Sequence, residues 1–343
     1  MYKASRALTS IRPEELDQYL SRGWFRMDQS IFTSQFLQDD DFIFRDMVWL
    51  RHRLSSFRFP KWYRKMKKDL QFSVFIDDAH PSASHEFLYQ KYRETKPEGW
   101  SASLEDILFG ERSENVFNTK VINIWCGEEL VAAGFFDQGN NSAAGIVNFY
   151  DPRFSKYSLG KYLYYLSVEH AISEGLEFFY PGYFAPGNPH LDYKLGMDKH
   201  SLEFFHSIYE AWYPFRLFKE EHLSLPLMQQ KLSDLYHTLE DMGIQAYMVT
   251  NANYQFQYNS KWDSPYAVYI VPADPRDSHF AVTYDVNVRR YYIFDCTERN
   301  WIDELRVIDH QLVCFATLGL SKPLADEYHF SNTVKRLHEL IES

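Results

Sequence analysis

The chain has 343 residues, of which 45% are hydrophobic and 18% aromatic, and its formal net charge is -11. This apolar content excludes a disordered protein and predicts a globular one with two or three folded units. No run approaches the roughly 20 apolar residues of a membrane-spanning helix, and the first residues lack the apolar centre of a signal peptide. We therefore expect a cytoplasmic protein that makes no use of a membrane.

Cysteine usage excludes two further kinds of protein. Only Cys126, Cys296 and Cys314 are present, and they are far apart in the sequence. They cannot form a disulfide framework or a four-thiolate metal site. We expect three buried thiols, and neither a metal nor a cofactor.

The charge is unevenly distributed along the chain. Residues 1–80 carry 14 Lys and Arg against 11 Asp and Glu, and the segment 51–68 holds eight Lys or Arg and no acid. Trp62 and Tyr63 lie inside this basic segment. It is either a nucleic-acid contact or the solvated face of a basic helix.

The N-terminal part predicts short elements. Pro13 and a first turn rich in acids favour a helix over residues 12–23, which Gly23 ends. Strand-like pieces follow, and residues 61–70 are compatible with a helix. Near-helical spacing of aromatic and apolar residues predicts another helix over residues 84–96.

The middle of the chain has a clearer pattern. Apolar runs at 120–125 and 129–136 flank a Cys-Gly-Glu-Glu turn and predict a hairpin, followed by a third strand at 143–150. Ser158 is a candidate cap for a helix over 159–173, which Gly175 ends before a strand at 176–180. Three strands, a crossover helix and a parallel strand are the layout of an N-acyltransferase-like sheet.

The pattern changes beyond Pro214. A helix at 225–242, apolar and aromatic runs at 245–250, 266–271 and 279–295, and a helix at 331–341 indicate an appended α+β unit. The predicted fold class is therefore α+β, with a GNAT-like mixed sheet, a crossover helix and this C-terminal unit. The predicted domains are residues 1–80, residues 81–214 and residues 215–343.

Polar residues gather where two of the predicted parallel strands end. The first strand ends on Asp151 and leads through a polar loop to Ser158, Gly160 and Lys161. Backbone N–H groups of a glycine-rich loop usually bind the pyrophosphate of coenzyme A, and this loop has a single glycine. The loop therefore fits an acyl donor other than coenzyme A better. The basic segment suggests a donor that is attached to RNA.

The second strand supplies the other half of the candidate site. Tyr180 and Tyr183 end this strand, and Asp192, Tyr193 and Lys194 return polar groups to the same sheet edge, where ligands bind in open sheets. The alternative is that the aromatic residues belong to the core and that the acids serve a turn and the solvent.

The order of these motifs resembles the arginyl-tRNA-protein transferase family, including its bacterial leucyl-tRNA-protein transferase branch. The resemblance covers roughly residues 15–212. It rests on Gly23-Trp24, the basic segment with Lys65, Asp69 and Leu70, His85–Tyr92, Phe149–Pro152, Ser158–Tyr162, Tyr180–Tyr183, and Tyr193-Lys194. The chain departs from the family in one respect, since residues 26–36 lack its usual N-terminal cysteine cluster.

The resemblance implies a reaction: an amino acid, arginine or leucine, moves from charged tRNA to the N-terminal amine of an acceptor protein and marks it for degradation. Acidic acceptor N-termini are expected. Such aminolysis needs a neutral amine, a stabilised oxyanion and a proton for the leaving hydroxyl.

Each candidate residue then has an expected role. Asp151 would hold or deprotonate the amine, Tyr183 or Tyr193 would donate to the oxyanion or leaving oxygen, and Lys194 and Lys161 would pair with an acidic side chain or a phosphate. The expected catalytic residues are Asp151, Tyr183, Tyr193 and Lys194. The expected substrate-binding residues are Ser158, Gly160, Lys161, Tyr180 and Asp192.

The resemblance also assigns the basic segment to aminoacyl-tRNA, with Lys and Arg on phosphates and an aromatic ring on an unpaired base. The residues expected to contact tRNA are Arg51, Arg53, Lys61, Trp62, Tyr63, Arg64, Lys65, Lys67 and Lys68. Two alternatives stay open, a coenzyme A-dependent N-acyltransferase on the same sheet and a non-catalytic binding descendant of the family.

Overall fold

The structure is a computed structural model of the chain. It describes residues 2–38, 43–68, 71–96, 100–112, 114–251, 254, 264–271, 278–296, 301–308, 311–317, 320 and 322–341, without the side chains of 301–308 and 311–317. Asp69 and Leu70, which follow the basic segment, and the side chain of Cys314 lie outside these residues.

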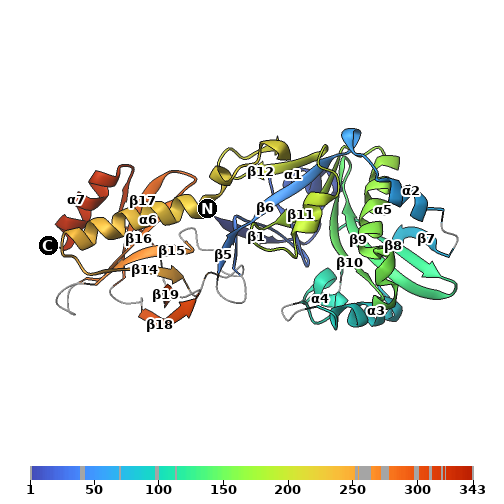
Figure 1. The fold of residues 1–343 in the computed structure, drawn as a ribbon, viewed down its shortest axis with the longest axis horizontal. Coiled ribbons are helices and arrows are strands. Elements are labelled where there is room, and N and C mark those ends of the chain that lie inside the picture. The colour runs from blue at the N-terminus through green and yellow to red at the C-terminus, as the bar shows by residue number, and fades with distance from the viewer. Residues whose placement is uncertain are drawn as a thin grey trace. The chain divides into compact units, whose positions relative to one another are not determined.

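The chain divides into two compact units. One comprises residues 5–33 and 48–218, and it holds every residue expected at the site. The other comprises residues 1–4, 34–47 and 219–343. Both combine helices with strands, so the expected α+β class is confirmed (Figure 1).

An eight-stranded mixed sheet forms the centre of the first unit, in the order β13-β12-β6-β11-β10-β9-β8-β7. Its strands are β6 (Val48–Arg53), β7 (Ser73–Asp78), β8 (Thr119–Cys126), β9 (Glu129–Gln138), β10 (Ser142–Tyr150), β11 (Phe178–Phe184), β12 (Leu202–His206) and β13 (Ala211–Pro214). A small sheet precedes it, formed by β1 (Lys3–Ala7), β2 (Phe25–Met27) and β3 (Ser30–Ser34).

Helices cover both faces of the eight-stranded sheet (Figure 1). The helices of this unit are α1 (Pro13–Ser21), α2 (Lys61–Met66), α3 (Ala83–Arg93), α4 (Leu104–Phe109) and α5 (Leu159–Ser173), with the 3-10 helices η1 (Leu54–Ser56), η2 (Pro152–Tyr157), η3 (Asp192–Gly196) and η4 (Phe215–Leu217). Alternation along β8 explains the two layers: Ile122 packs in the cluster of α5, whereas Val121 packs in that of α3 and α4.

The predicted hairpin and crossover are both present. β8 and β9 pair antiparallel across the Cys-Gly-Glu-Glu turn, and α5 connects β10 to β11, which pair in parallel. Gly175 adopts a φ of +74°, as expected of the glycine that ends this helix. Ser158, in contrast, adopts a φ of +53° and its side chain makes no capping hydrogen bond, so its predicted capping role is wrong.

Parallel pairing of β10 with β11 is short. Ala144 and Tyr180 are its last partners, after which β10 stays with β9 while β11 stays with β6. Irregular register at Gly145–Val147 accompanies this divergence. The two strands therefore separate in the middle of the sheet and leave backbone groups between them that are not committed to the β10–β11 ladder.

The second unit is built around a seven-stranded sheet in the order β18-β19-β14-β15-β16-β17-β20. Its strands are β14 (Ala246–Asn251), β15 (Tyr266–Ile270), β16 (Phe280–Asp285), β17 (Arg290–Asp295), β18 (Trp301–Ile308), β19 (Gln311–Thr317) and β20 (Ala325–Glu327), and a separate pair is β4 (Phe36–Gln38) with β5 (Phe44–Asp46). Its helices are η5 (Glu220–His222), α6 (Ser224–Asp241) and α7 (Phe330–Ile341). The run predicted at 279–295 is two strands joined by a turn.

The observed units differ from the predicted domains at the first boundary. Residues 1–80 do not form a unit, because β6 pairs with β11 and β12 and β7 pairs with β8. Residues 34–47 join the C-terminal residues instead, since Phe36 and Phe44 are buried in the same core as α6.

Candidate active site

A cavity of about 440 Å³ lies where β10 and β11 separate. Ala144, Gly145 and Ile146 line it from β10, and Pro181, Gly182 and Tyr183 line it from β11. In the sequence these residues belong to two of the strands that we expected to end at the site. The cavity therefore occupies the place where a ligand can reach the backbone of both strands.

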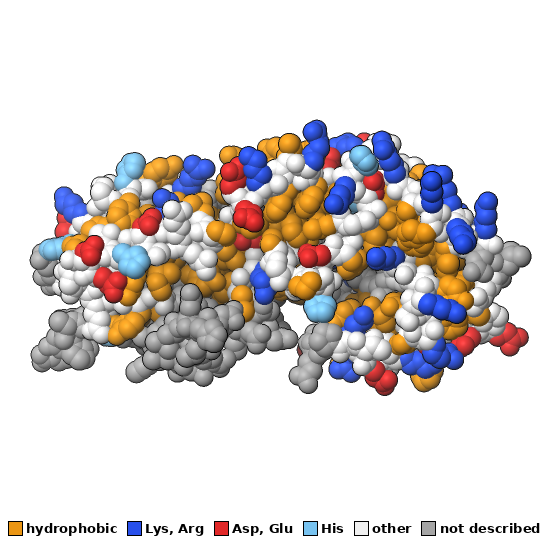
Figure 2. Space-filling view, viewed as in Figure 1, with side chains coloured by type: hydrophobic (Ala, Val, Ile, Leu, Met, Phe, Trp, Pro, Cys, Tyr) orange, Lys and Arg blue, Asp and Glu red, His pale blue; other side chains and the backbone are white. Residues whose placement is uncertain are grey.

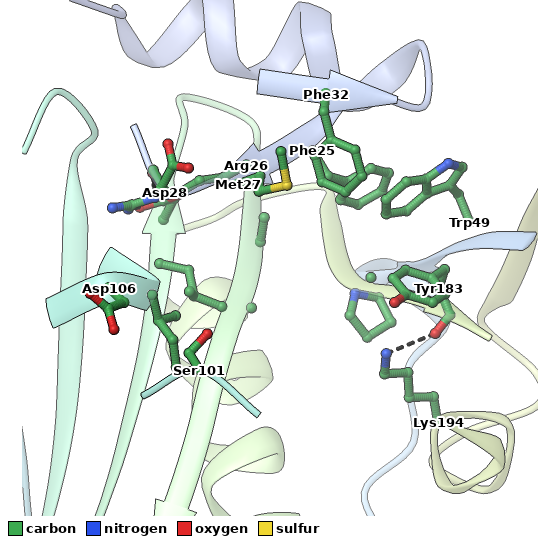
Figure 3. Close-up of a pocket in the computed structure, with 17 residues that line it drawn as sticks. Phe25, Arg26, Met27, Asp28, Phe32, Trp49, Ser101, Asp106, Tyr183 and Lys194 are labelled. Carbon is green, nitrogen blue, oxygen red and sulfur yellow. Dashed lines mark hydrogen bonds and ion pairs between the residues drawn. The ribbon is translucent and has the colours of Figure 1, made fainter. Parts of the chain in front are cut away.

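Aromatic rings form one wall of the cavity (Figure 3). The rings of Phe25 and Trp49 stack with their centroids 3.8 Å apart and their planes at 7°. Phe32 and Tyr183 both meet Trp49 edge to face, at 5.5 Å and 5.2 Å. This wall offers an apolar surface of fixed shape to a ligand.

Lys194 supplies a positive charge at the cavity. Its side chain is buried, and its Nζ donates a hydrogen bond of 2.7 Å to the carbonyl oxygen of Tyr183 (Figure 3). Burial lowers the pKa of Lys194 from 10.5 to about 8. The amine is therefore held beside the β11 backbone with donor capacity to spare.

Acidic residues line another part of the cavity. Asp28 and Asp106 lie on the side of the close-up opposite Tyr183 and Lys194 (Figure 3). Asp137, at the end of β9, is fully buried, and its Oδ1 accepts hydrogen bonds from Thr119 Oγ1 at 2.6 Å and Arg26 Nη1 at 2.9 Å. Burial raises the pKa of Asp137, against the lowering effect of Arg26.

Asp151 has a different environment from the one expected. It is not among the residues lining the cavity, and its carboxylate accepts hydrogen bonds from the backbone and guanidinium of Arg153 and from Lys91 at 3.2 Å. Hydrogen bonding to Arg153 holds the pKa of Asp151 well below its usual range. A carboxylate with these partners is a poor base, so we replace its expected catalytic role with that of anchoring the start of η2.

Tyr193, expected to be catalytic, and the residues expected to bind substrate are spread around the strand ends. Tyr180 is buried in the core, with its ring 5.5 Å from that of Trp212. Tyr193 and Asp192 are exposed, as are Ser158 and Lys161. None of these residues, nor Gly160, lines the cavity, so Tyr183 and Lys194 are the expected site residues found there. Tyr193 stays close to Lys194, whose Nζ lies 5.8 Å from the centroid of its ring.

Two residues expected to contact tRNA belong to the core. Arg51 is buried, donates from Nε to Glu203 at 2.6 Å and lies over the ring of Phe178. Tyr63 is 1% exposed and donates from its hydroxyl to Glu169 at 2.8 Å. Because neither side chain can reach a phosphate or a base, both assignments are wrong.

The other basic residues remain at the surface. Lys and Arg side chains gather over the part of the first unit that carries α2 (Figure 2). Arg53 pairs with Glu203 at 3.1 Å and Lys67 with Glu169 at 2.7 Å, while 39% of Trp62 is exposed. The remaining residues of the group, Lys61, Arg64, Lys65 and Lys68, are exposed.

Sequence reasoning missed the contribution of residues 25–32 and of Asp137 to this cavity. The Gly-Trp element just before Phe25 was a signal for this segment, but nothing in its spacing indicated that it lies beside β10. An acid at the end of the predicted strand 129–136 was the corresponding signal for Asp137.

Comparison with known proteins gives this geometry its context. Residues 61–203 match the model for the C terminus of arginine-tRNA-protein transferases. The resemblance to this family is confirmed. The match includes β10, β11 and Lys194, whereas residues 25–32 of the aromatic wall precede it.

Similar curated proteins support the same family. Aspartate/glutamate leucyltransferase of Campylobacter jejuni is 26% identical over 190 residues, which are 53% of this chain and 77% of that protein. The enzyme of the same name from Leptospira interrogans is 25% identical over 181 residues, covering 48% and 70%. The model of arginine-tRNA-protein transferases and proteins named as leucyltransferases thus both resemble this chain.

Solved structures show weaker similarity. L-PGS from Bacillus licheniformis matches 53% of this chain and 51% of that chain, with a TM-score of 0.33 and 13% identity. A GCN5-related N-acetyltransferase from Kribbella flavida matches 43% and 50%, with a TM-score of 0.27 and 11% identity.

Three further sequence-based expectations concern single features. Cys296 is buried as expected, whereas Cys126 is only half-buried. Within the described residues, no three or more His, Cys, Asp or Glu side chains are placed to hold a metal ion. Among the helices that the structure describes, none has the length and apolar character needed to cross a membrane.

Proposed function

We propose that this protein is an aminoacyl-tRNA-protein transferase that moves leucine from charged tRNA to the N-terminal amine of proteins beginning with Asp or Glu. The family match over residues 61–203 supports the reaction class, and the names of the relatives support the donor and the acceptors. The observation that carries the proposal is the cavity between β10 and β11 with Lys194 buried beside it.

The reaction is aminolysis of an ester. The acceptor nitrogen forms a bond to the carbonyl carbon of the aminoacyl group, the bond to the tRNA ribose oxygen breaks, and that oxygen leaves with a proton. Because the ester is already activated, positioning of the two substrates can supply most of the rate acceleration. A cavity lined by two diverging strands suits this task, since backbone groups on both sides can orient the reacting carbonyl.

Lys194 is the proposed recognition group for the acceptor. A buried ammonium with unused donors can pair with the side-chain carboxylate of an N-terminal Asp or Glu. The hydroxyl of Tyr183, which lines the same cavity, is proposed to donate to the oxyanion or the leaving oxygen. Tyr193, which is 47% exposed and lies outside the cavity lining, is less suited to that role.

The aromatic wall supports leucine as the donor amino acid. Phe25, Phe32 and Trp49 present an apolar surface that matches an aliphatic side chain. Arginine, which the family name carries, is the alternative donor, because Asp28 and Asp106 line the same cavity and are able to pair with a guanidinium.

The surface around α2 is the proposed tRNA contact. Lys61, Arg64, Lys65 and Lys68 are exposed there, and Trp62 is available for stacking on an unpaired base. Degradation of the modified acceptor is the expected consequence of the transfer.

The proposal is tested by mixing the purified protein with labelled leucyl-tRNA or arginyl-tRNA and with peptides beginning with Asp, Glu or Ala. We expect label from leucyl-tRNA to enter the Asp and Glu peptides. Transfer from arginyl-tRNA alone would reverse the donor assignment. Absence of transfer from both donors would refute the proposed function.

A matched pair of variants assigns the acceptor preference to the cavity. Lys194→Met removes the buried charge, and we expect it to reduce transfer to Asp peptides at least tenfold while Ala peptides change little. Lys199→Met removes an exposed charge close by in the sequence and outside the cavity lining, and serves as the control.

A further inference from the structure

One oxygen of a buried carboxylate at the cavity has no partner. Asp137 lines the cavity and is fully buried, and its Oδ1 accepts the hydrogen bonds from Thr119 and Arg26. Its Oδ2 is also buried, yet within the described part of the chain it accepts no hydrogen bond. A buried acceptor without a hydrogen bond lowers the stability of the fold. This suggests that a donor from another molecule satisfies it.

Arg26 is not free to move and satisfy this oxygen. Its Nε donates to the carbonyl oxygen of Asp28 at 2.6 Å, its Nη1 donates to Thr119 and Asp137, and its Nη2 donates to the carbonyl oxygen of Leu108. The guanidinium also lies 4.4 Å from the centroid of the Phe117 ring. Because these contacts fix Arg26 on the Oδ1 side, Arg26 leaves Oδ2 without a hydrogen bond.

The cavity has a donor to match this acceptor. The ammonium of Lys194 can donate three hydrogen bonds, and the one found among the described residues goes to the carbonyl oxygen of Tyr183. Asp137 pairs with Ala144 on β10, and Ala144 pairs with Tyr180 on β11. Two strand spacings of about 4.8 Å therefore put the backbones at Asp137 and Tyr180 roughly 10 Å apart.

We propose that Oδ2 of Asp137 binds the α-ammonium of the acceptor's first residue, while Lys194 binds the side-chain carboxylate of that same residue. The inference rests on the proposed function and extends it, because it names the group that positions the attacking nitrogen. Asp137 takes the place of Asp151, whose carboxylate is occupied by Arg153 and Lys91.

The pairing of charges favours the acceptor over the donor as the occupant. An aminoacyl ester of leucine or arginine carries an α-ammonium, but its carboxyl group is esterified and carries no charge. An N-terminal Asp or Glu has both an ammonium and a free carboxylate. The first residue of the acceptor therefore satisfies Asp137 and Lys194 together, whereas the aminoacyl group of the donor satisfies Asp137 alone.

Burial also suits Asp137 to this task. It raises the pKa of the carboxyl group, which makes the carboxylate a better acceptor of a proton than an exposed one. The α-ammonium must lose its proton before the nitrogen can attack the ester. Contact with Oδ2 therefore places that proton beside a suitable base.

The test measures binding without requiring catalysis. The probes are Asp-Ala-amide and succinyl-Ala-amide, which is the same molecule without the α-amine, and binding is followed by calorimetry. We expect the wild-type protein to bind Asp-Ala-amide at least tenfold more tightly than the succinyl compound. In Asp137→Asn, which keeps the volume and the Oδ1 acceptor, we expect this preference to disappear.

Kinetics then separate the two substrates. Asp137→Asn is expected to raise the KM for the acceptor peptide at least tenfold and to change the KM for aminoacyl-tRNA less than twofold. An increase confined to aminoacyl-tRNA would overturn the assignment to the acceptor. An unchanged preference between the two probes would overturn the role of Asp137 itself.

Glu203→Gln is the matched control. Glu203 is another buried acid in the same unit, paired with a buried arginine through Arg51 Nε at 2.6 Å, but it does not line the cavity. We expect it to retain the probe preference. If Asp137→Asn does not fold, Asp137→Glu, which keeps the charge but displaces the oxygen, is expected to lose the preference in the same way.

The two proposals fail differently. Selective probe binding that depends on Asp137, without transfer from either charged tRNA, would contradict the proposed function and leave the ammonium site intact. Transfer activity together with an unchanged probe preference in Asp137→Asn would support the function and refute the ammonium site.

Discussion

Lys194 Nζ lies 2.7 Å from the carbonyl oxygen of Tyr183, so a buried ammonium on η3 is hydrogen-bonded to the backbone of β11. The bond joins two segments that the intervening loop separates in the sequence. It also fixes the position of the charge next to Gly182, which lies beyond the last paired residues of β10 and β11.

The charge of Lys194 should be lost in a mildly alkaline range. Burial lowers its pKa to about 8, so the ammonium is present below pH 8 and the neutral amine predominates above it. We expect the affinity for an acidic acceptor peptide to fall above pH 8 in the wild type, and to fall less in Lys194→Arg. The measurement is peptide binding by calorimetry between pH 6.5 and 9.5.

Titration of the peptide's own α-amine is common to both proteins, so their difference reports on Lys194. Equal pH profiles would contradict the assignment. The lowered pKa of Lys194 also affects folding. Between pH 8 and 10.5 the unfolded chain binds more protons at Lys194 than the folded chain does. The contribution of Lys194 to the free energy of unfolding therefore rises with pH in this range.

Gly182 should not tolerate a side chain. Its φ is +90°, and an added Cβ would lie 3.4 Å from Lys194 Nζ. We expect Gly182→Ala to lower the free energy of unfolding by about 1–3 kcal/mol through backbone strain. We also expect a higher KM for the acidic acceptor, because the added methyl group would contact the ammonium proposed to bind it.

Gly127→Ala separates strain from crowding. Gly127 has a φ of +62°, and an added Cβ would meet nothing within 4 Å. Chemical denaturation and steady-state kinetics on both variants provide the measurement. A KM increase of the same size in Gly127→Ala would show that the effect does not come from Lys194.

Exposed charges around α2 should govern the salt dependence of tRNA binding. We expect replacement of Lys61, Arg64, Lys65 and Lys68 by Gln to reduce the slope of log Kd against log salt by about 3, since each phosphate contact contributes roughly 0.7–0.9. Fluorescence anisotropy with labelled tRNA at several salt concentrations measures the slope.

Four exposed charges of the other unit provide the control for this experiment. They are Lys219, Lys322, Lys335 and Arg336. Their replacement by Gln changes the net charge equally, so an equal reduction of the slope would show that the effect is not specific to the surface around α2.

Asp46 should stabilise the start of α6. Its carboxylate accepts a hydrogen bond from Ser224 N at 2.7 Å and from Leu225 N at 3.2 Å. We expect Asp46→Ala to destabilise this helix end by about 1–2 kcal/mol, as for other lost caps, and Asp46→Asn to cost less. Hydrogen exchange of peptides from α6 provides the measurement, with no change expected in α5.

The pH dependence of this cap has a defined sign. Burial raises the pKa of Asp46 to about 6, above its ordinary value of 3.8, so the folded chain binds the proton more tightly than the unfolded one. The stability it contributes is greatest below pH 3.8 and is lost as the pH rises through 6. Relative to Asp46→Asn, the wild-type helix end should therefore be less protected at pH 7.5 than at pH 5.

Local sequence patterns predicted most of the elements but not the long-range pairings. The hairpin of β8 and β9, the crossover helix α5 and the end of that helix at Gly175 all follow from periodicity and turn chemistry within a few residues. The place of β6 between β11 and β12 does not, because no feature of residues 48–53 specifies partners so far along the chain.

The same limit explains the errors at the site. Arg51 and Tyr63 were read as surface residues because their neighbours are basic, but their partners, Glu203 and Glu169, come much later in the sequence. Asp137 was missed for the same reason, since Arg26 and Thr119 belong to two other strands. A run of basic residues predicts an exposed basic surface only where no acidic residue from a distant part of the sequence pairs with them.

Residues 34–47 belong to the unit formed by the C-terminal residues, although they are synthesised before nearly all of the other unit. Phe36 and Phe44 therefore have no core to enter until α6 and its sheet have been made. During translation these two aromatic side chains stay unburied until the C-terminal residues have been made, and we expect this delay to slow folding and to favour association. A shortened chain that stops at residue 218 would keep these side chains but lose their core, so trimming the protein to its transferase region calls for replacement of residues 34–47 as well.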